Sequence, residues 1–104
     1  MRDIPRLKAE FFKALGHPLR IRALELLSEQ ERSVSSLAAE MAVEQPALSQ
    51  QLGILRRAGF VVAHRDGVNV IYALADPRIA ELLSVSRQML LDMVSDTREA
   101  LRAS

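Results

Sequence analysis

The chain has 104 residues, of which 49% are hydrophobic and 26% are charged, a composition typical of a folded globular protein. Chains divide into several domains only beyond about 250 residues, so we expect one domain over residues 1–104. The formal net charge is +1 and no cysteine is present, which excludes disulfides, iron–sulfur clusters, thiolate metal sites and cysteine nucleophiles.

The N-terminal segment MRDIPRLKAEFF is charged and has no long apolar region, unlike a signal peptide. No run approaches the 18 or so apolar residues that a membrane-spanning helix needs. We therefore expect a cytoplasmic protein with no membrane partner.

The small net charge conceals alternating blocks. Residues 1–27 carry six bases against three acids, residues 28–44 carry one base against four acids, and residues 45–72 carry three arginines against one aspartate. The remaining residues, 73–104, carry four bases and five acids. Such blocks leave room for one basic face on a nearly neutral protein.

Apolar residues at helical spacing predict two helices in the first third of the chain. The first stripe consists of Ile4, Leu7, Phe11 and Leu15. It stops at Gly16-His17-Pro18, and Pro18 suits the first turn of a second helix. The apolar positions of that second helix are Ile21, Leu24, Leu26 and Leu27. For His17 we expect a packing or capping role at this junction.

Two shorter helices are predicted next. Ser33 can cap a third helix, in which Leu37 and Met41 face inward. Residues 43–45 make a tight connection, and Pro46 fits the first turn of a fourth helix that ends at Gly59. The inward side of this fourth helix carries Leu48, Leu52 and Leu55.

The pattern then changes to two β-rich runs, residues 60–65 and 68–74. Asp66-Gly67 lies between them as a two-residue hairpin loop. Asp76-Pro77 opens a last helix, and no glycine or proline interrupts residues 78–104. The predicted fold is mainly α with a small β-hairpin, in the order α-α-α-α-β-β-α.

Two short helices followed directly by a hairpin form a helix-turn-helix with a wing, an arrangement that reads DNA through its second helix. The outward side of the fourth helix carries side chains that can bond to base edges or phosphates. The predicted DNA-binding residues are Gln45, Pro46, Ala47, Ser49, Gln50, Arg56 and Arg57, joined by Arg65 and Asn69 of the wing. A simply solvated polar face is the alternative interpretation.

Three strings in this sequence resemble the ArsR/SmtB family of bacterial winged-helix repressors. They are ALGHPLRIR at residues 14–22, QPALSQQL followed by LRRAGFV within residues 45–61, and RDG with YAL within residues 65–74. The resemblance implies a winged helix-turn-helix, a homodimer, and a repressor released from DNA by an effector that it does not identify.

The chain departs from the family pattern at three positions. Gln51 stands where the family usually has histidine, Gly53 where a base is common, and Val68 where the wing often has arginine. Hydrogen bonding survives at Gln51, whereas Gly53 and Val68 remove phosphate contacts. Arg65 is therefore expected to carry more of the contact made by the wing.

No metal or other cofactor is predicted. Many relatives sense metals through cysteine on the third helix or histidine on the last, and this chain has neither. The two histidines, His17 and His64, belong to the junction and the wing and are expected to lie apart. Asp92, Asp96 and Glu99 have a spacing that could gather a hard cation, but nearby arginines favour a solvated helix face.

An enzyme is not expected, because no nucleophile elbow, phosphate loop or paired carboxylates support one. We instead expect a sequence-specific regulator that binds a near-palindromic operator on double-stranded DNA, released by a non-thiol and non-metal effector. A protein-interaction winged helix or an anti-repressor is the alternative.

A dimer built from the first and last helices is predicted by apolar residues that one small domain cannot cover. The expected interface residues are Leu7, Phe11, Leu82, Met89, Leu90 and Met93. The same stripe on the last helix includes Ile79, Leu83, Val94 and Leu101. The alternative is a last helix that folds back onto its own domain.

Overall fold

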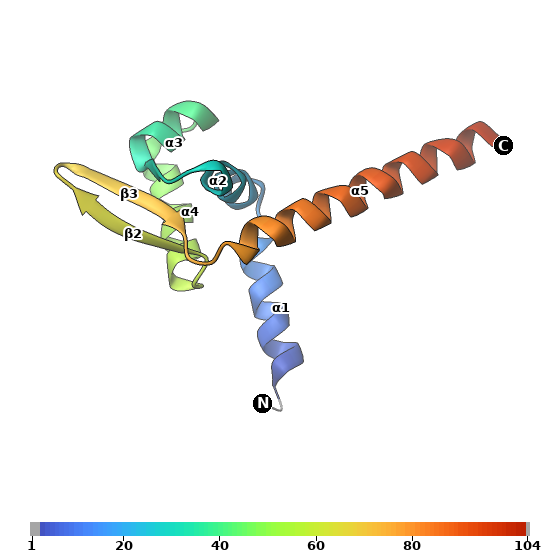
Figure 1. Ribbon diagram of the computed structural model, residues 1–104, viewed down its shortest axis with the longest axis horizontal. Helices are drawn as coiled ribbons and strands as arrows, with labels where there is room; N and C mark the ends of the chain where they lie inside the picture. The colour runs from blue at the N-terminus through green and yellow to red at the C-terminus, as the bar shows by residue number, and fades with distance from the viewer. Residues whose placement is uncertain (1–2, 104) are drawn as a thin grey trace.

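The computed structural model describes residues 3–103, so Met1, Arg2 and Ser104 of the expected domain lie outside the described residues. Its elements are α1 (Ile4–Leu15), α2 (Pro18–Glu29), β1 (Arg32–Ser33), α3 (Val34–Met41), α4 (Gln45–Arg57), β2 (Val61–Asp66), β3 (Asn69–Leu74) and α5 (Arg78–Ala103). Figure 1 shows the hairpin of β2 and β3 beside α4, with α1 and α5 extending away from this group. The predicted order of helices and hairpin is confirmed, with one strand added.

Two of the predicted helix starts are formed by side-chain caps. The Nδ1 atom of His17 accepts a hydrogen bond of 3.1 Å from the backbone N–H of Leu19, so the histidine at the junction caps α2. Ser33 Oγ accepts a bond of 3.1 Å from the N–H of Ser36 and caps α3. Each bond satisfies a backbone donor that the first turn of a helix leaves without a partner.

The additional strand, β1, makes the sheet three-stranded. The strands lie in the order β1-β3-β2, and both pairings are antiparallel. Arg32 lies opposite Tyr72 and Ser33 opposite Ile71. Sequence periodicity did not predict this strand, because a two-residue strand has no periodicity of its own and exists only through its pairing with β3.

The hairpin loop lies one residue later than the sequence predicted. Asp66 pairs with Asn69, so the two loop residues are Gly67 and Val68 rather than Asp66 and Gly67. Gly67 has a φ of +64°. The φ of Val68 is not positive, because Ala42 is the one non-glycine residue of the described chain with a positive φ. A positive φ at the first loop position alone is the pattern of a type II′ turn, which requires glycine there and accepts valine next.

The core lies between the helices and the sheet and fixes the position of α4. Its fully buried large side chains come from α2, α3, α4 and the start of β2, namely Leu24, Leu37, Leu48, Leu52, Leu55, Phe60 and Val61. Leu37 is buried as predicted, and Met41 is half-buried against the same cluster. Three leucines of α4 belong to this core, so the helix is held along its whole inner side.

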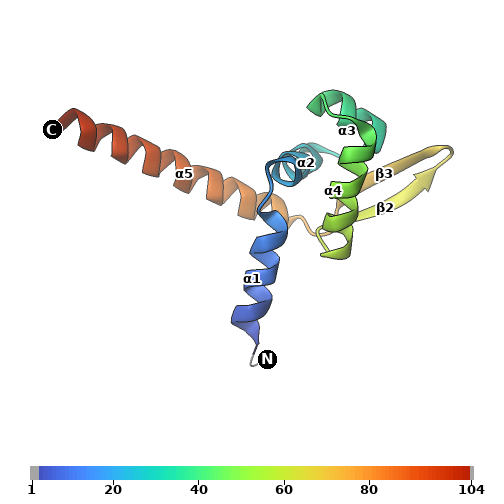
Figure 2. The same cartoon turned by 180° about the vertical axis from the view of Figure 1, so that it is seen from behind.

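α5 extends away from the core, with its C-terminus far from the hairpin in both views (Figures 1 and 2). Only its first turns pack on the domain, where Ile79 and Leu83 are 7% and 9% exposed. The expectation that these two residues face outward is therefore wrong, because the start of α5 closes the core of its own chain. Met89, Leu90, Met93 and Val94 are exposed, as are Leu7 and Phe11 of α1. No helix among residues 3–103 is long and apolar enough to cross a membrane.

Candidate nucleic-acid interface

The helix-turn-helix consists of α3, the turn at residues 42–44, and α4. Ala42 adopts a left-handed conformation with φ 55° and ψ 45°, and its N–H donates to the carbonyl oxygens of Ala38 and Ala39. The next N–H, of Val43, also donates to Ala38 at 3.1 Å. These bonds satisfy the last carbonyls of α3 and turn the chain into α4 without a glycine.

The two sides of α4 differ completely in exposure. Leu48, Leu52 and Leu55 have no exposed surface. The opposite side presents the exposed side chains predicted to contact DNA, namely Gln45, Pro46, Ala47, Ser49, Gln50, Arg56 and Arg57. All seven predicted residues of this helix are thus exposed.

Arg56 and Arg57 lie in the last turn of α4, where their charge also stabilises the negative end of the helix dipole. The Arg57 side chain folds back over Gly53, since a Cβ atom built on that glycine would lie 3.3 Å from Arg57 Nη1. The space above Gly53 is therefore occupied by a guanidinium group.

The two predicted wing residues lie on opposite faces of the hairpin. Arg65 pairs with Val70, in line with Val61 and Ala63 on the face that packs on the helices. Asn69 pairs with Asp66, so it lies on the other face, because successive side chains alternate along a strand. Of these two predicted residues, Arg65 is therefore the one on the helix-facing side of the wing. Val68, at the tip, is 95% exposed.

The side chains of several polar candidates on this surface make no hydrogen bond or ion pair to other described residues. This holds for Gln50, Arg56, Arg57 and Arg65 across residues 3–103. Such side chains need no internal bond to be broken before they contact a base or a phosphate.

Sequence reasoning did not identify Arg32 as a residue that fastens the wing to the helices. Its Nη2 atom lies 2.9 Å from Glu29 Oε2 and its Nη1 atom 3.0 Å from Glu40 Oε2. The guanidinium therefore joins the end of α2 to α3, while its backbone pairs with β3. The acidic block at residues 28–44 was the available signal, because a single arginine among four glutamates is a natural ion-pairing centre.

Two polar side chains lie partly inside the helical packing. Gln51 Oε1 and Arg20 Nε are buried and have no hydrogen-bond partner among the described residues. Gln51 is thus directed inward rather than toward the surface that Gln50 presents.

The start of α5 is held by Asp76 and Arg78. Asp76 Oδ1 accepts the backbone N–H of Arg78 at 2.9 Å, and Asp76 Oδ2 lies 2.7 Å from Arg78 Nη2. The side-chain and backbone bonds from Arg78 lower the pKa of Asp76 from its ordinary 3.8 to about 2. The predicted opening of the last helix at Asp76-Pro77 thus has a defined capping carboxylate.

No group of three or more histidine, aspartate or glutamate side chains suited to a metal ion occurs within residues 3–103. His17 is engaged in the cap of α2, and His64 lies on β2 opposite Ile71. Asp92 accepts a hydrogen bond from Gln88 on the exposed surface of α5.

Comparison with known proteins identifies the family. The model described as "Bacterial regulatory protein, arsR family" matches residues 17–62. The uncharacterised HTH-type transcriptional regulator Rv0081 of Mycobacterium tuberculosis (strain H37Rv) is 58% identical over 92 residues, which cover 88% of this chain and 81% of the relative. A probable mercury resistance operon repressor of Streptomyces lividans is 34% identical over 88 residues, covering 85% of this chain and 70% of that one.

Solved structures agree with this assignment. The crystal structure of Rv0081 matches with a TM-score of 0.84 and 56% identity, over 90% of this chain and 95% of that one. The solution structure of the homodimeric winged helix-turn-helix domain of Mb0332 from Mycobacterium bovis matches with a TM-score of 0.76 and 28% identity, over 88% and 83% of the two chains. This chain is therefore a winged helix-turn-helix member of the arsR family, a family of DNA-binding transcriptional regulators and not of enzymes.

Proposed function

We propose that this regulator is a repressor that binds a near-palindromic operator as a homodimer and is released by an effector that is neither a thiol reagent nor a metal ion. The observation that carries the DNA-binding part is the outer surface of α4. There, Gln50 and Arg57 are both exposed on a helix whose inner leucines are fully buried.

Base reading is assigned to Gln50 and Arg57. A glutamine amide can bond to N6 and N7 of adenine, and a guanidinium can bond to O6 and N7 of guanine. Gln45, Ser49 and Arg56 add contacts to bases or phosphates, and the apolar Pro46 and Ala47 fit against thymine methyl groups. Arg65 and Asn69 extend the contact from the wing to the backbone or the minor groove.

The dimer is assigned to α1 and α5. Leu90 and Met93 are each 60% exposed on a helix that extends away from its own domain (Figure 1). An apolar groove of about 560 Å³ between the two helices is lined by Ile4, Leu7, Lys8, Phe11, Phe12 and Leu82. Monomers seldom expose apolar surface of this extent. A second copy would cover it and would hold two α4 helices about 34–36 Å apart, one turn of DNA.

The donor atoms of the chain support the proposed class of effector. The chain contains no cysteine, and both histidines lie outside any acidic cluster among residues 3–103. Release by a metal would need about four nitrogen, sulfur or oxygen ligands in compact geometry. An organic ligand requires no such set of metal-coordinating atoms. Bound near the dimer helices, it can release the protein from DNA by changing the spacing of the two α4 helices.

The test is selection of bound duplexes from a random DNA pool, followed by affinity measurements on the enriched site. We expect two inverted half-sites. Gln50→Ala should relax the preference at one base pair in each half-site by about fivefold or more, the effect of losing a bidentate base contact. Gln30→Ala changes an exposed glutamine at the end of α2 and should leave the preference intact.

Two results would contradict the proposal. One is the absence of any enriched sequence. The other is a Gln50→Ala variant that keeps every base preference of the wild type. A partner protein bound by the same surface, with a salt-insensitive affinity and no DNA binding, would support the protein-interaction alternative instead.

A further inference from the structure

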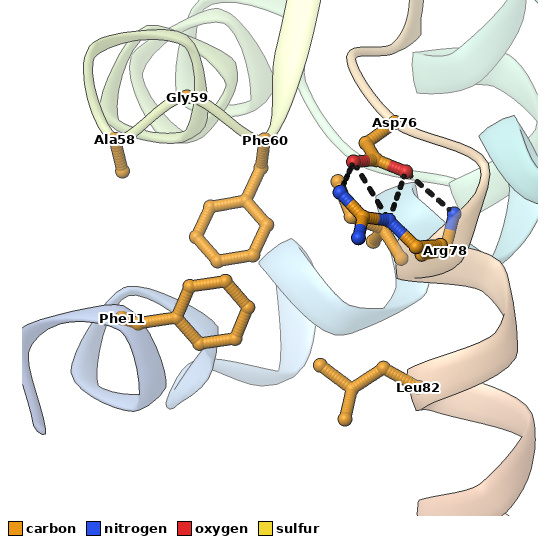
Figure 3. A pocket seen from close by; sticks show the side chains of 8 residues that line it. Phe11, Ala58, Gly59, Phe60, Asp76, Arg78 and Leu82 are labelled. Atoms are coloured by element: carbon orange, nitrogen blue, oxygen red, sulfur yellow. Dashed lines mark hydrogen bonds and ion pairs between the residues drawn. The ribbon is translucent and has the colours of Figure 1, made fainter. Parts of the chain in front are cut away.

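A cavity of about 350 Å³ lies where α1, the end of α4, the start of β2 and the start of α5 meet. Figure 3 shows the rings of Phe11 and Phe60 on one side of it, Leu82 below, and the pair formed by Asp76 and Arg78 on the other side. Its volume falls at the small end of the range of about 300–1,000 Å³ found for ligand pockets. A cavity of about 150 Å³ already holds one benzene ring, so a substituted ring or two fused rings fit into this one.

The apolar part of the cavity has two aromatic walls, the buried Phe60 and the partly exposed Phe11. Phe60 is 1% exposed and belongs to the core, and its carbonyl oxygen accepts the N–H of Ala75 at 2.9 Å. Phe11 lies against it, with ring centroids 4.7 Å apart and an interplanar angle of 48°, but remains 40% exposed. A ligand ring can therefore stack on the exposed part of Phe11, while the buried Phe60 backs that ring from the core.

The polar part of the cavity is an oriented guanidinium. Arg78 Nε donates to both carboxylate oxygens of Asp76 at 3.1 Å, and Nη2 donates to one of them at 2.7 Å. Within residues 3–103, the third nitrogen, Nη1, has no hydrogen-bond partner. The Arg78 side chain is 81% exposed, and its bonds to Asp76 orient the guanidinium, so Nη1 can offer its two N–H donors to a ligand.

We infer that this cavity binds a small aromatic compound that carries one oxygen acceptor, such as an aromatic carboxylate. The ring would stack on Phe11, next to the buried Phe60, and contact Leu82, while the oxygen would accept hydrogen bonds from Arg78 Nη1. Sites for small molecules are typically lined by apolar side chains, with a small number of polar groups in positions that orient the ligand.

The position of the cavity gives such a ligand a regulatory role, and this part of the inference rests on the proposed function. Phe11 and Leu82 line both the cavity and the groove between α1 and α5 that the proposed dimer covers. Ala58 and Gly59, which also line the cavity, end α4. A bound ring would therefore move the dimer helices relative to α4 and change the affinity for DNA.

Binding can be measured without DNA by fluorine NMR on protein labelled with fluorophenylalanine. The chain has three phenylalanines, Phe11, Phe12 and Phe60, and Phe12 lines the groove but not the cavity. Benzoate at millimolar concentrations should shift the signals of Phe11 and Phe60 saturably and more than that of Phe12. Toluene, which lacks the oxygen, and cyclohexanecarboxylate, which lacks the aromatic ring, should bind more weakly.

Arg78→Gln should weaken benzoate binding by about tenfold or more, the loss expected for one charge-assisted hydrogen bond, and should leave toluene binding unchanged. Arg102→Gln removes the same charge from the last turn of α5 and should have no effect. The inference is overturned if no probe gives a saturable shift, if the shift centres on Phe12, or if Arg78→Gln binds benzoate as tightly as the wild type.

The regulatory part is tested separately by fluorescence anisotropy on the selected operator. Benzoate should lower the affinity for the operator, and it should have no effect on the Arg78→Gln variant. Unchanged operator affinity at saturating benzoate would overturn the coupling. A protein that binds benzoate but no DNA would contradict the proposed function and leave the site standing, whereas operator binding without probe binding would do the reverse.

Discussion

The ring of Phe11 in α1 lies 4.7 Å, centroid to centroid, from the ring of Phe60, the residue before β2. This contact joins a helix that extends from the domain to the segment that directly follows α4. Phe11 comes before the helix-turn-helix in the chain and Phe60 comes after it, so the pair connects the proposed dimer surface with the DNA-reading surface through a single contact.

The first prediction concerns this pair. In a double-mutant cycle of Phe11→Leu and Phe60→Leu, the coupling in unfolding free energy should be about 0.5–1.5 kcal/mol, the contribution of an aromatic pair beyond its buried area. The measurement is urea unfolding at a fixed protein concentration. The cycle of Phe12→Leu with Phe60→Leu is the control and should be additive, since the ring of Phe12 packs on Phe11 and, among the described residues, makes no ring contact with Phe60. Additivity in both cycles would contradict the role given to the pair.

The wing should show different electrostatic behaviour for its two polar residues. Arg65→Ala should weaken binding to all sequences similarly and reduce the slope of log affinity against log salt by about one, because one phosphate contact is lost. Asn69→Ala carries no charge change and lies on the other face, so its slope should equal that of the wild type. Affinities measured by anisotropy over a range of salt concentrations check this. Equal slopes for wild type and Arg65→Ala would exclude a phosphate contact at Arg65.

The dimer should depend on the apolar side of α5 beyond its first turns. Leu90→Glu combined with Met93→Glu places two charges on this exposed apolar side and should give monomers in analytical ultracentrifugation, with loss of tight operator binding. The control is Ser84→Glu with Ser95→Glu, which adds the same charges on the opposite, polar side of the helix. A wild-type chain that sediments as a monomer at micromolar concentration while binding one palindrome tightly would refute the dimer.

The start of α5 should have an acid-dependent contribution to stability. The pKa of Asp76 is lowered from 3.8 to about 2 by its bonds from Arg78, so the folded state favours the ionised carboxylate. This stabilisation is present above the ordinary pKa and is lost as the pH falls toward 2. Asp76→Asn should melt below the wild type at neutral pH, and the two melting temperatures should converge as the pH approaches about 2.

Circular dichroism melts across this pH range provide the measurement. Asp96→Asn removes a carboxylate from the exposed part of the same helix and serves as the control, with a smaller difference at neutral pH. A constant gap between Asp76→Asn and wild type down to the lowest pH would show that ionisation of Asp76 is not the source of the stabilisation.

The turn of the helix-turn-helix should be stabilised by glycine. Ala42 has a φ of 55°, a left-handed conformation that costs a residue with a Cβ atom roughly 1 kcal/mol. Ala42→Gly removes that strain, partly offset by the greater entropy of the unfolded chain, so unfolding free energy should rise by about 0.5 kcal/mol. Ala39→Gly, in the interior of α3, is the matched control and should be destabilising. Chemical denaturation distinguishes the two signs.

The sequence by itself determined the elements that local patterns encode. The spacing of Leu48, Leu52 and Leu55 predicted which side of α4 is buried, and all three are fully buried. Ser33 and the Gly16-His17-Pro18 junction marked helix boundaries that the caps confirm. The outer side of α4 was predictable for the same reason, because the side chains of a helix repeat every 3.6 residues and the buried side fixes the exposed one.

Only the tertiary structure decided features that depend on contacts between distant segments. The strand β1 exists because residues 32–33 meet β3, some 40 positions later in the chain. The hairpin register placed Gly67 and Val68 in the loop and put Arg65 and Asn69 on opposite faces, since a shift of one residue exchanges the faces of a strand. Periodicity marked Ile79 and Leu83 as apolar, but only packing showed that they close their own core while Leu90 and Met93 remain exposed. The cavity between Phe11, Phe60 and Arg78 has the same origin: three segments far apart in the sequence form it together.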